Sequence, residues 1–195
     1  IVMTSITRHS RVKPHIYGAE NLPTEGGYIM YPNHQGKYDS IGIVLGHKRP
    51  CSIVIDKKRS YLPVANEFVL LTNCKRLDRS NMKNQIKTIL EIIKEVKNGR
   101  IFIIFPEGGY TNNHNNLQDF MAGTFKCSLK SKTPIIPVAL IDSYKVYYKF
   151  SFKPVHTQVH YLEPIYYDEY KDLSTKEIAD MVKERIQTKI NEVTK

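Results

Sequence analysis

Tryptophan is absent from this chain of 195 residues, and cysteine is scarce. The three cysteines, Cys51, Cys74 and Cys127, are far apart and form no CxxC pair and no metal-ligand spacing. We therefore expect partly buried thiols in a reducing environment, rather than a disulfide framework or a zinc site.

Long hydrophobic runs are missing as well. The strongest apolar segments, residues 101–105 and 134–141, have the length of strands and fall short of the ~20 residues that a transmembrane helix needs. No signal peptide is recognisable. The chain starts at Ile1-Val2 without an initiator methionine, which leaves open an upstream segment such as a membrane anchor.

What the chain has in excess is positive charge. The 29 Lys and Arg residues outnumber the 19 Asp and Glu residues, so the net charge is +10. Such a balance attracts polyanions: nucleic acids, anionic lipid headgroups or phosphorylated small molecules. Charge alone does not choose among these partners.

Apolar runs alternate with amphipathic patterns along the whole chain, which predicts a single α/β domain over residues 1–195. Strands are predicted at residues 27–31, 51–56, 100–105, 135–141, 146–152 and 155–162. Helices are predicted at residues 40–46, 61–71, 81–98 and 121–131, and in a closing segment that starts with the capping-box pattern at Ser174 and Glu177. The polar segment 107–119 is predicted to be a loop.

The two long helices each show an apolar face at helical spacing. In residues 81–98 this face comprises Met82, Ile86, Ile89, Leu90, Ile93 and Val96, with Gly99 as the expected C-terminal cap. In the closing helix it comprises Ile178, Val182, Ile186, Ile190 and Val193.

Two polar clusters follow predicted strands, at residues 33–39 and 106–109. In open α/β sheets, ligands bind beyond the carboxyl ends of the strands. The first cluster holds His34 five residues before Asp39, which is expected to cap the next helix. An aspartate in this place can fix the tautomer of the imidazole and stabilise the imidazolium, so that His34 acts as a general base toward a hydroxyl group.

The spacing of this pair is not specific by itself, because His114 and Asp119 repeat it. At least one of the two pairs is therefore accidental or structural. His34 follows an apolar strand and Asp39 opens an apolar helix, whereas His114 lies in a polar loop. The setting favours the first pair.

Further motifs follow in order along the chain. Together they resemble the four sequence blocks of the glycerolipid acyltransferase family, which includes the lysophosphatidic acid acyltransferases. The matching residues are Asn33, His34 and Asp39; Leu77, Asp78 and Arg79; Phe105, Pro106, Glu107 and Gly108; and residues 134–138. The downstream residues Phe120, Gly123 and Phe125 also match, and the resemblance spans roughly residues 15–142.

The resemblance implies an α/β fold with a central mixed sheet flanked by helices, like that of glycerol-3-phosphate acyltransferase. It implies an O-acyltransferase of phospholipid biosynthesis. The acyl chain would pass from acyl-CoA or acyl-carrier protein to the free hydroxyl of 1-acylglycerol 3-phosphate, giving phosphatidic acid. The thioester is a co-substrate, and no metal or other cofactor is implied.

The same resemblance assigns roles to individual residues. His34 would be the base and Asp39 would orient it. Arg79 would bind the phosphate of the acceptor, while Glu107 and the backbone of Gly108 would position its glycerol part.

Two departures from the family pattern concern the acceptor. Gly109-Tyr110 stands where Thr-Arg is common, and Gly36-Lys37 replaces a serine and an aromatic residue. Lys37, Lys126 or Arg76 could supply the missing positive charge. Glycerol 3-phosphate and lipids without a phosphate therefore remain alternative acceptors.

We expect peripheral association with an anionic membrane on its cytoplasmic face. Basic clusters occur at residues 8–13, 57–59 and 145–153, and the last is also rich in aromatic residues. A solvated strand pair explains the last cluster equally well, and steering of an acidic carrier protein is a third explanation of the charge.

Two functions of other classes compete with this interpretation. One is a non-enzymatic module that binds nucleic acid or membranes, although no nucleic-acid motif is recognisable and a nucleic-acid partner is not expected. The other is a metal hydrolase built on His34, Asp39 and Glu107, whose spacing matches no metal motif.

Overall fold

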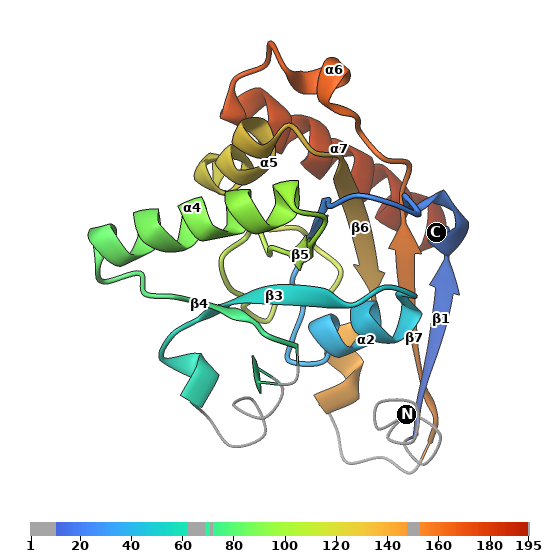
Figure 1. Cartoon of the computed structure of the whole chain (residues 1–195). Helices are drawn as coiled ribbons and strands as arrows, with labels where there is room; N and C mark the ends of the chain where they lie inside the picture. Colours follow the sequence, from blue (N-terminus) through green and yellow to red (C-terminus); the bar gives the residue numbers. More distant parts are fainter. Residues whose placement is uncertain (1–10, 62–68, 71, 148–152, 195) are drawn as a thin grey trace.

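A seven-stranded sheet forms the centre of the molecule (Figure 1). The structure is a computed structural model that describes residues 11–61, 69–70, 72–147 and 153–194. The strands are β1 (Val12–Tyr17), β2 (Ile29–Pro32), β3 (Cys51–Asp56), β4 (Lys75–Leu77), β5 (Ile101–Ile103), β6 (Ile135–Ile141) and β7 (Val155–Tyr161). Their order across the sheet is β1-β7-β6-β2-β5-β3-β4.

The sheet is mixed, as predicted. Strands β6, β2, β5, β3 and β4 are parallel neighbours, whereas β7 runs antiparallel to β6 and parallel to β1. Every residue of β2 and β6 is buried. This is expected of strands that are covered by side chains on both faces of a sheet.

Helices cover both faces of the sheet, so the fold has three layers (Figure 1). The α-helices are α2 (Asp39–Gly46), α4 (Met82–Lys97), α5 (Lys126–Ser131), α6 (Tyr167–Tyr170) and α7 (Thr175–Val193). Short 3₁₀ turns are η1 (Ala19–Asn21), η2 (Arg59–Tyr61), η3 (Ala122–Phe125) and η4 (Ser143–Tyr147). Helices α4, α5 and α7 contribute to one of the two large hydrophobic cores and α2 to the other.

The alternation of side chains along β2 explains the two cores. Ile29 and Tyr31 pack with the α4, α5 and α7 side, whereas Met30 packs with Ile43 of α2. Successive residues of a strand point to opposite faces, so one short strand joins both cores.

Local signals place the ends of the two long helices as predicted. The side chain of Asn81 accepts a hydrogen bond from the Asn84 amide at the start of α4, and Gly99 lies just past its end with φ +92°. At the start of α7, Ser174 and Glu177 form the predicted capping box.

Other predictions about helices were wrong in detail. Asp39 is the first residue of α2 rather than its N-cap, which is Tyr38. The helix predicted over residues 121–131 is divided into the 3₁₀ turn η3 and the helix α5. Val193 is 36% exposed, so it lies outside the buried face of α7.

The edge strands were harder to predict. Strand β1 and the three-residue strand β4 were missed, because both contain lysine and lie at the edges of the sheet, where charged residues are common. Residues 146–147 belong to η4 rather than to a strand. Residues 148–152 and most of the predicted helix 61–71 lie outside the described residues.

Among the helices in the described part of the chain, none is both long and apolar enough to cross a bilayer.

Candidate active site

The two polar clusters meet at one edge of the sheet. Strands β2 and β5 are parallel neighbours, so the segments that follow their carboxyl ends lie side by side. The backbone amide of His34, after β2, donates a hydrogen bond of 3.0 Å to Oε1 of Glu107, after β5. Residues 73 positions apart in the chain are thus joined directly.

His34 and Asp39 form a close pair. The distance from Nδ1 of His34 to Oδ2 of Asp39 is 2.7 Å. The side chain of Asp39 is completely buried, while that of His34 is 15% exposed. A carboxylate can only accept hydrogen bonds, so the pairing favours the tautomer with hydrogen on Nδ1, and the lone pair of Nε2 remains available as a base.

The buried carboxylate of Asp39 has hydrogen-bond donors at both oxygens. Oδ2 also accepts from the backbone amides of Gln35, at 2.5 Å, and Gly36, at 2.9 Å. Oδ1 accepts from the hydroxyl of Ser143, at 2.5 Å. Fully satisfied in this way, a buried charge can hold the imidazole in one orientation.

Two aromatic rings contact the imidazole of His34. Phe105 stacks on it, with ring centroids 4.1 Å apart and planes inclined by 27°. Tyr110 packs against it edge-on, with centroids 4.7 Å apart and an angle of 72°. Tyr110 occupies the position where the family pattern commonly has arginine, so this departure lies directly beside the candidate base.

Glu107 is engaged by the protein itself. Its Oε1 accepts from the His34 amide, and its Oε2 accepts from Nε2 of Gln118 at 2.6 Å. Burial raises the pKa of this carboxyl group above its ordinary value. Through these contacts Glu107 holds the loop that carries His34. Its contact with an acceptor stays a prediction.

The structure brings Arg79 to the same place. Gly108 has φ +72°, and a Cβ atom built on it would lie 3.0 Å and 3.1 Å from the two terminal nitrogens of Arg79. The guanidinium group therefore lies against the glycine that follows Glu107. Within the described part of the chain, no carboxylate forms an ion pair with Arg79, so its charge is available to a bound anion.

Lys37 and Lys126 are exposed and belong to different segments, the loop before α2 and the first turn of α5. In the part of the chain that the structure describes, neither forms a hydrogen bond or an ion pair with His34, Glu107 or Arg79. Their roles in substrate binding stay predictions.

The second histidine–aspartate pair does not form. The ring of His114 stacks on Tyr144, with centroids 4.4 Å apart, while Asp119 pairs with Lys183 at 2.9 Å. The identical spacing in the sequence thus has two outcomes, and only the pair at the carboxyl end of β2 is joined.

Sequence reasoning missed the residues that support the site from β6. The side chain of Asn33 donates to the carbonyl of Leu140 and accepts from its amide, and Oε1 of Gln35 accepts from the amide of Ser143. Because β6 is the other parallel neighbour of β2, its carboxyl end reaches the same edge. Ser143, a polar residue just after β6, was the feature of the sequence that could have indicated this support.

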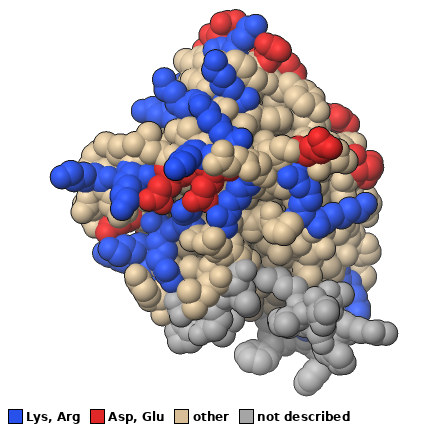
Figure 2. Space-filling model, in the orientation of Figure 1, with Lys and Arg blue, Asp and Glu red and all other residues tan. Residues whose placement is uncertain are grey.

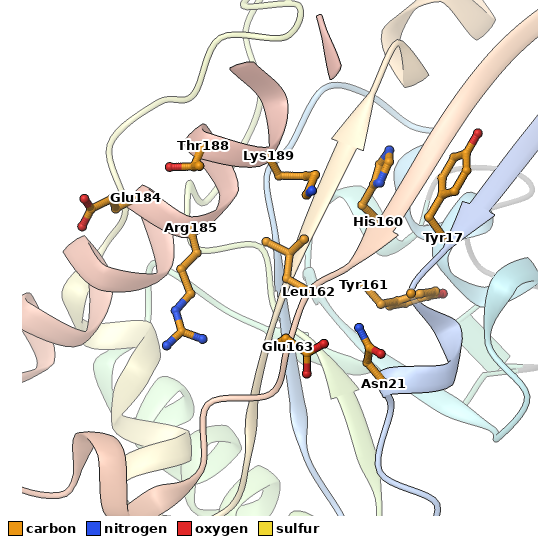
Figure 3. Close-up of a pocket in the computed structure, with 11 residues that line it drawn as sticks. Tyr17, Asn21, His160, Tyr161, Leu162, Glu163, Glu184, Arg185, Thr188 and Lys189 are labelled. Carbon is orange, nitrogen blue, oxygen red and sulfur yellow. The ribbon is translucent and has the colours of Figure 1, made fainter. Parts of the chain in front are cut away.

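A separate pocket of about 610 Å³ lies elsewhere (Figure 3). Tyr17, His160 and Lys189 are among its lining residues, from the ends of β1 and β7 and from α7. Tyr17 and His160 lie at the carboxyl ends of β1 and β7, which run antiparallel to β6. The pocket therefore lies at the end of the strands opposite to that of His34. It contains no residue of the four sequence blocks.

A histidine held by a buried aspartate lies at the carboxyl edge of an open α/β sheet, an arrangement that can serve as a general base toward a hydroxyl group. Residues 13–141 match the family model described as Acyltransferase. The chain belongs to this acyltransferase family, as the four sequence blocks predicted.

Curated relatives are similar over most of this chain. The putative 1-acyl-sn-glycerol-3-phosphate acyltransferase acl-2 of Caenorhabditis elegans is 27% identical, over 68% of this chain and 47% of that protein. The 1-acyl-sn-glycerol-3-phosphate acyltransferase of Cocos nucifera is 28% identical, over 86% of this chain and 54% of that protein. The chain thus spans about half the length of these two relatives. The bacterial enzyme of the same name from Borreliella burgdorferi is 28% identical, over 91% of this chain and 73% of its own length.

A solved structure shares the fold. The crystal structure of the 1-acyl-sn-glycerophosphate acyltransferase PlsC from Thermotoga maritima matches 98% of this chain and 80% of its own, with a TM-score of 0.76 and 21% identity. At this identity the likeness shows the fold, and the fold is the α/β acyltransferase fold that the sequence predicted.

Proposed function

We propose that this protein transfers a fatty acyl chain from an acyl thioester to the free hydroxyl of 1-acylglycerol 3-phosphate, giving phosphatidic acid. The observation that carries the proposal is the contact between Nδ1 of His34 and the buried carboxylate of Asp39, which leaves Nε2 as a base. The names of the relatives support the choice of acceptor.

The reaction needs one base and no covalent enzyme intermediate. Nε2 of His34 takes the proton of the acceptor hydroxyl while its oxygen attacks the thioester carbon. The C–S bond then breaks, and the leaving thiolate receives the proton from the imidazolium. Asp39 stabilises that imidazolium through its charge and its hydrogen bond to Nδ1.

Arg79 is the candidate for binding the phosphate of the acceptor. Its guanidinium lies against Gly108, close to the residues that hold His34, and a guanidinium can bind phosphate through two hydrogen bonds. Because Gly108 has no side chain, its backbone can adopt the positive φ and a ligand can approach it closely. Both properties support its proposed place beside the glycerol part of the acceptor.

The direct test combines one variant with product identification. Purified wild-type protein is incubated with acyl-CoA or acyl-carrier protein as donor, and products are identified by mass spectrometry. We expect phosphatidic acid from 1-acylglycerol 3-phosphate, and loss of nearly all product in His34→Ala. His114→Ala is the matched control and should keep full activity. Unchanged transfer in His34→Ala would refute the proposal.

A second acceptor class is favoured by one observation. Tyr110, in the place of the usual arginine, packs on His34 and removes one expected cation from the acceptor side. The same assay therefore includes glycerol 3-phosphate and a monoacylglycerol, which lacks phosphate. Preference for the monoacylglycerol, with no effect of Arg79→Ala, would replace the phosphate-bearing acceptor.

We further propose that the protein works as a peripheral protein on the cytoplasmic face of the membrane, with the lipid acceptor and the thioester donor as its partners. Acyl-carrier protein is the alternative donor to acyl-CoA, and nucleic acid is not a partner. Activity that persists after treatment with a chelator is expected, and its loss would favour metal chemistry instead.

A further inference from the structure

The apolar face predicted for α4 is divided in the structure. Of that face, Val96 is buried in the core beside the sheet, together with Ile92, which the prediction did not include. Three other apolar side chains face outward and are 71%, 52% and 60% exposed: Met82, Ile86 and Leu90. We refer to Met82, Ile86 and Leu90 as the α4 apolar stripe.

The α4 apolar stripe is a continuous feature of one helix. Its residues are four positions apart, so they lie one above another on the helix surface, over about 12 Å at 1.5 Å per residue. Single exposed apolar side chains are common and need no explanation. Three in a row, each more than half exposed on a helix that has already filled its core-facing side, suggest a surface that contacts something apolar.

Positive charge accompanies the stripe. Lys83 and Lys87 each follow a stripe residue by one position, about 100° around the helix, and Lys94 lies on the same flank. All three lysines are exposed, and none of them forms an ion pair within the residues that the structure describes. Figure 2 shows basic side chains gathered on the left of the view, the side on which α4 lies in Figure 1.

The acidic residues of α4 are neutralised by the protein. Glu91 accepts from Lys75 at 3.2 Å, and Glu95 pairs with Lys75 at 2.5 Å and with Arg100 at 2.7 Å. The charge that α4 presents to solvent beside its stripe is therefore positive. An apolar strip with a lysine border complements an anionic lipid surface, since lysines can keep their ammonium groups at the headgroups while apolar side chains enter the acyl region.

The stripe also begins next to the candidate site. Met82 comes three residues after Arg79, whose guanidinium lies against Gly108. A bilayer in contact with the first turn of α4 would therefore lie close to the group proposed to bind the acceptor phosphate. A lipid acceptor could then present its headgroup while its acyl chain stays at the membrane.

We infer that the α4 apolar stripe and the flanking Lys83, Lys87 and Lys94 dock the protein on an anionic bilayer surface beside its active site. The delivery of acceptor rests on the proposed function, whereas the docking itself can be measured without activity. This surface differs from the basic segments predicted from the sequence. Of those, Lys57 pairs with Asp78 at 3.0 Å, and residues 8–10 and 148–152 lie outside the described part of the chain.

Flotation with lipid vesicles tests the docking. The vesicles contain either phosphatidylcholine alone or phosphatidylcholine with phosphatidylglycerol, and circular dichroism confirms that each variant is folded. We expect the triple variant Met82→Gln, Ile86→Gln and Leu90→Gln to bind mixed vesicles at least tenfold more weakly than the wild type. Tyr166→Gln, an exposed aromatic residue before α6, is the apolar control and should bind normally.

Two double variants of lysine test the role of positive charge. Lys83→Gln with Lys87→Gln should weaken binding to mixed vesicles by about 30-fold, because each lysine near an anionic surface contributes about 1 kcal/mol. The control Lys48→Gln with Lys130→Gln removes the same charge from exposed positions outside α4 and should have a smaller effect. An equal loss of vesicle binding in both double variants would mean that only the net charge matters, and would overturn the assignment of the docking surface to α4.

Two further outcomes would overturn the docking. One is unchanged vesicle binding by the triple variant. The other is a wild-type dimer in sedimentation velocity that the triple variant abolishes, because the stripe would then be covered by a second copy of the chain.

An activity assay separates this inference from the proposed function. Toward a short-chain, water-soluble 1-acylglycerol 3-phosphate, the triple variant should match the wild type, and it should be slower only toward acceptor embedded in vesicles. A wild type that acylates neither acceptor would refute the proposed function and leave the vesicle-binding result standing.

Discussion

At the scale of single residues, Asp39 combines burial, charge and a full set of hydrogen bonds. An asparagine in its place could keep an oxygen at the Oδ2 position, toward His34 and the two amides, and turn its NH₂ group toward the hydroxyl of Ser143. Asp39→Asn therefore removes the negative charge while the geometry can persist. This isolates the electrostatic part of its role.

We expect Asp39→Asn to fold normally and to lower kcat by about 10²- to 10⁴-fold, because the imidazolium loses its counter-charge. Steady-state kinetics with a single donor and acceptor would measure this effect. Asp119→Asn is the matched control, since it changes the aspartate of the second pair, and it should keep wild-type kcat. A similar loss in both variants would contradict a special role for Asp39.

Glu107 makes a prediction about stability and pH. Burial raises its pKa in the folded protein above the ordinary 4.5, so the folded state holds this proton more tightly than the unfolded state. Its contribution to stability is therefore fully present below pH 4.5 and is lost as the pH rises through the raised pKa. Glu107→Gln, which cannot titrate, provides the reference.

We expect the free energy of unfolding of the wild type, relative to Glu107→Gln, to fall as the pH rises above 4.5 and then to level off. Urea denaturation at a series of pH values measures this difference. A relative stability that increases with pH over that range would mean that the carboxylate is favoured by its hydrogen bonds more than it is penalised by burial.

Tyr110 bears on the choice of acceptor. Tyr110→Arg places a cation at the position where the family pattern commonly has one, and we expect it to raise kcat/KM for 1-acylglycerol 3-phosphate by about tenfold relative to a monoacylglycerol. Tyr110→Phe keeps the edge-on contact with His34 and should leave the ratio unchanged. An unchanged ratio in Tyr110→Arg would show that this position does not reach the phosphate.

At the scale of elements, α7 is stabilised by a capping box at its N-terminus and by packing against the core along its length. The capping box at Ser174 supplies hydrogen bonds to the first turn, and five buried residues anchor the helix: Ile178, Ala179, Val182, Ile186 and Ile190. Packing keeps the helix in place even when the cap is removed. The cap therefore affects stability rather than fold.

Ser174→Ala should lower the free energy of unfolding by about 1 kcal/mol, which corresponds to about 2–4 °C in Tm for a chain of this size. Thermal denaturation followed by circular dichroism measures the shift. Ser174→Asp retains an acceptor for the Glu177 amide and should stay within about 0.5 kcal/mol of the wild type. A loss as large in Ser174→Asp would point to a cause other than capping.

At the scale of the whole molecule, one sheet joins both ends of the described chain. Strand β1 pairs with β7 and β2 pairs with β6, so residues from the beginning and the end of the sequence share the same layers. Buried side chains of β2 take part in both cores. Removal of one element therefore exposes surface in several others.

We expect the protein to unfold as one cooperative unit, in agreement with a single domain over residues 1–195. Far-ultraviolet circular dichroism reports the helices, and near-ultraviolet circular dichroism reports the packed tyrosines. The two urea transitions should coincide. Transitions separated by more than the experimental error would indicate two units instead.

The sequence by itself determined the family and the principal elements. Continuous apolar runs placed the central strands, because both faces of such strands are buried, and the helical spacing of apolar residues placed α4 and α7, because a helix buries one face. The four sequence blocks pointed to the acyltransferase family, and the carboxyl ends of the strands predicted where the polar clusters would meet.

Tertiary structure alone decided which partners those residues have. His34-Asp39 and His114-Asp119 share one spacing, and only the first pair is joined. The loop after β2 gives Asp39 two amide donors, and the packing of β2 against β6 brings the hydroxyl of Ser143 to its other oxygen. The same applies to α4, whose apolar positions read as one core face. The core beside it buries Val96 and Ile92, which the predicted face left out, whereas Met82, Ile86 and Leu90 stay exposed. Periodicity records that a face is apolar, whereas the shape of its surroundings decides how much of that face is covered.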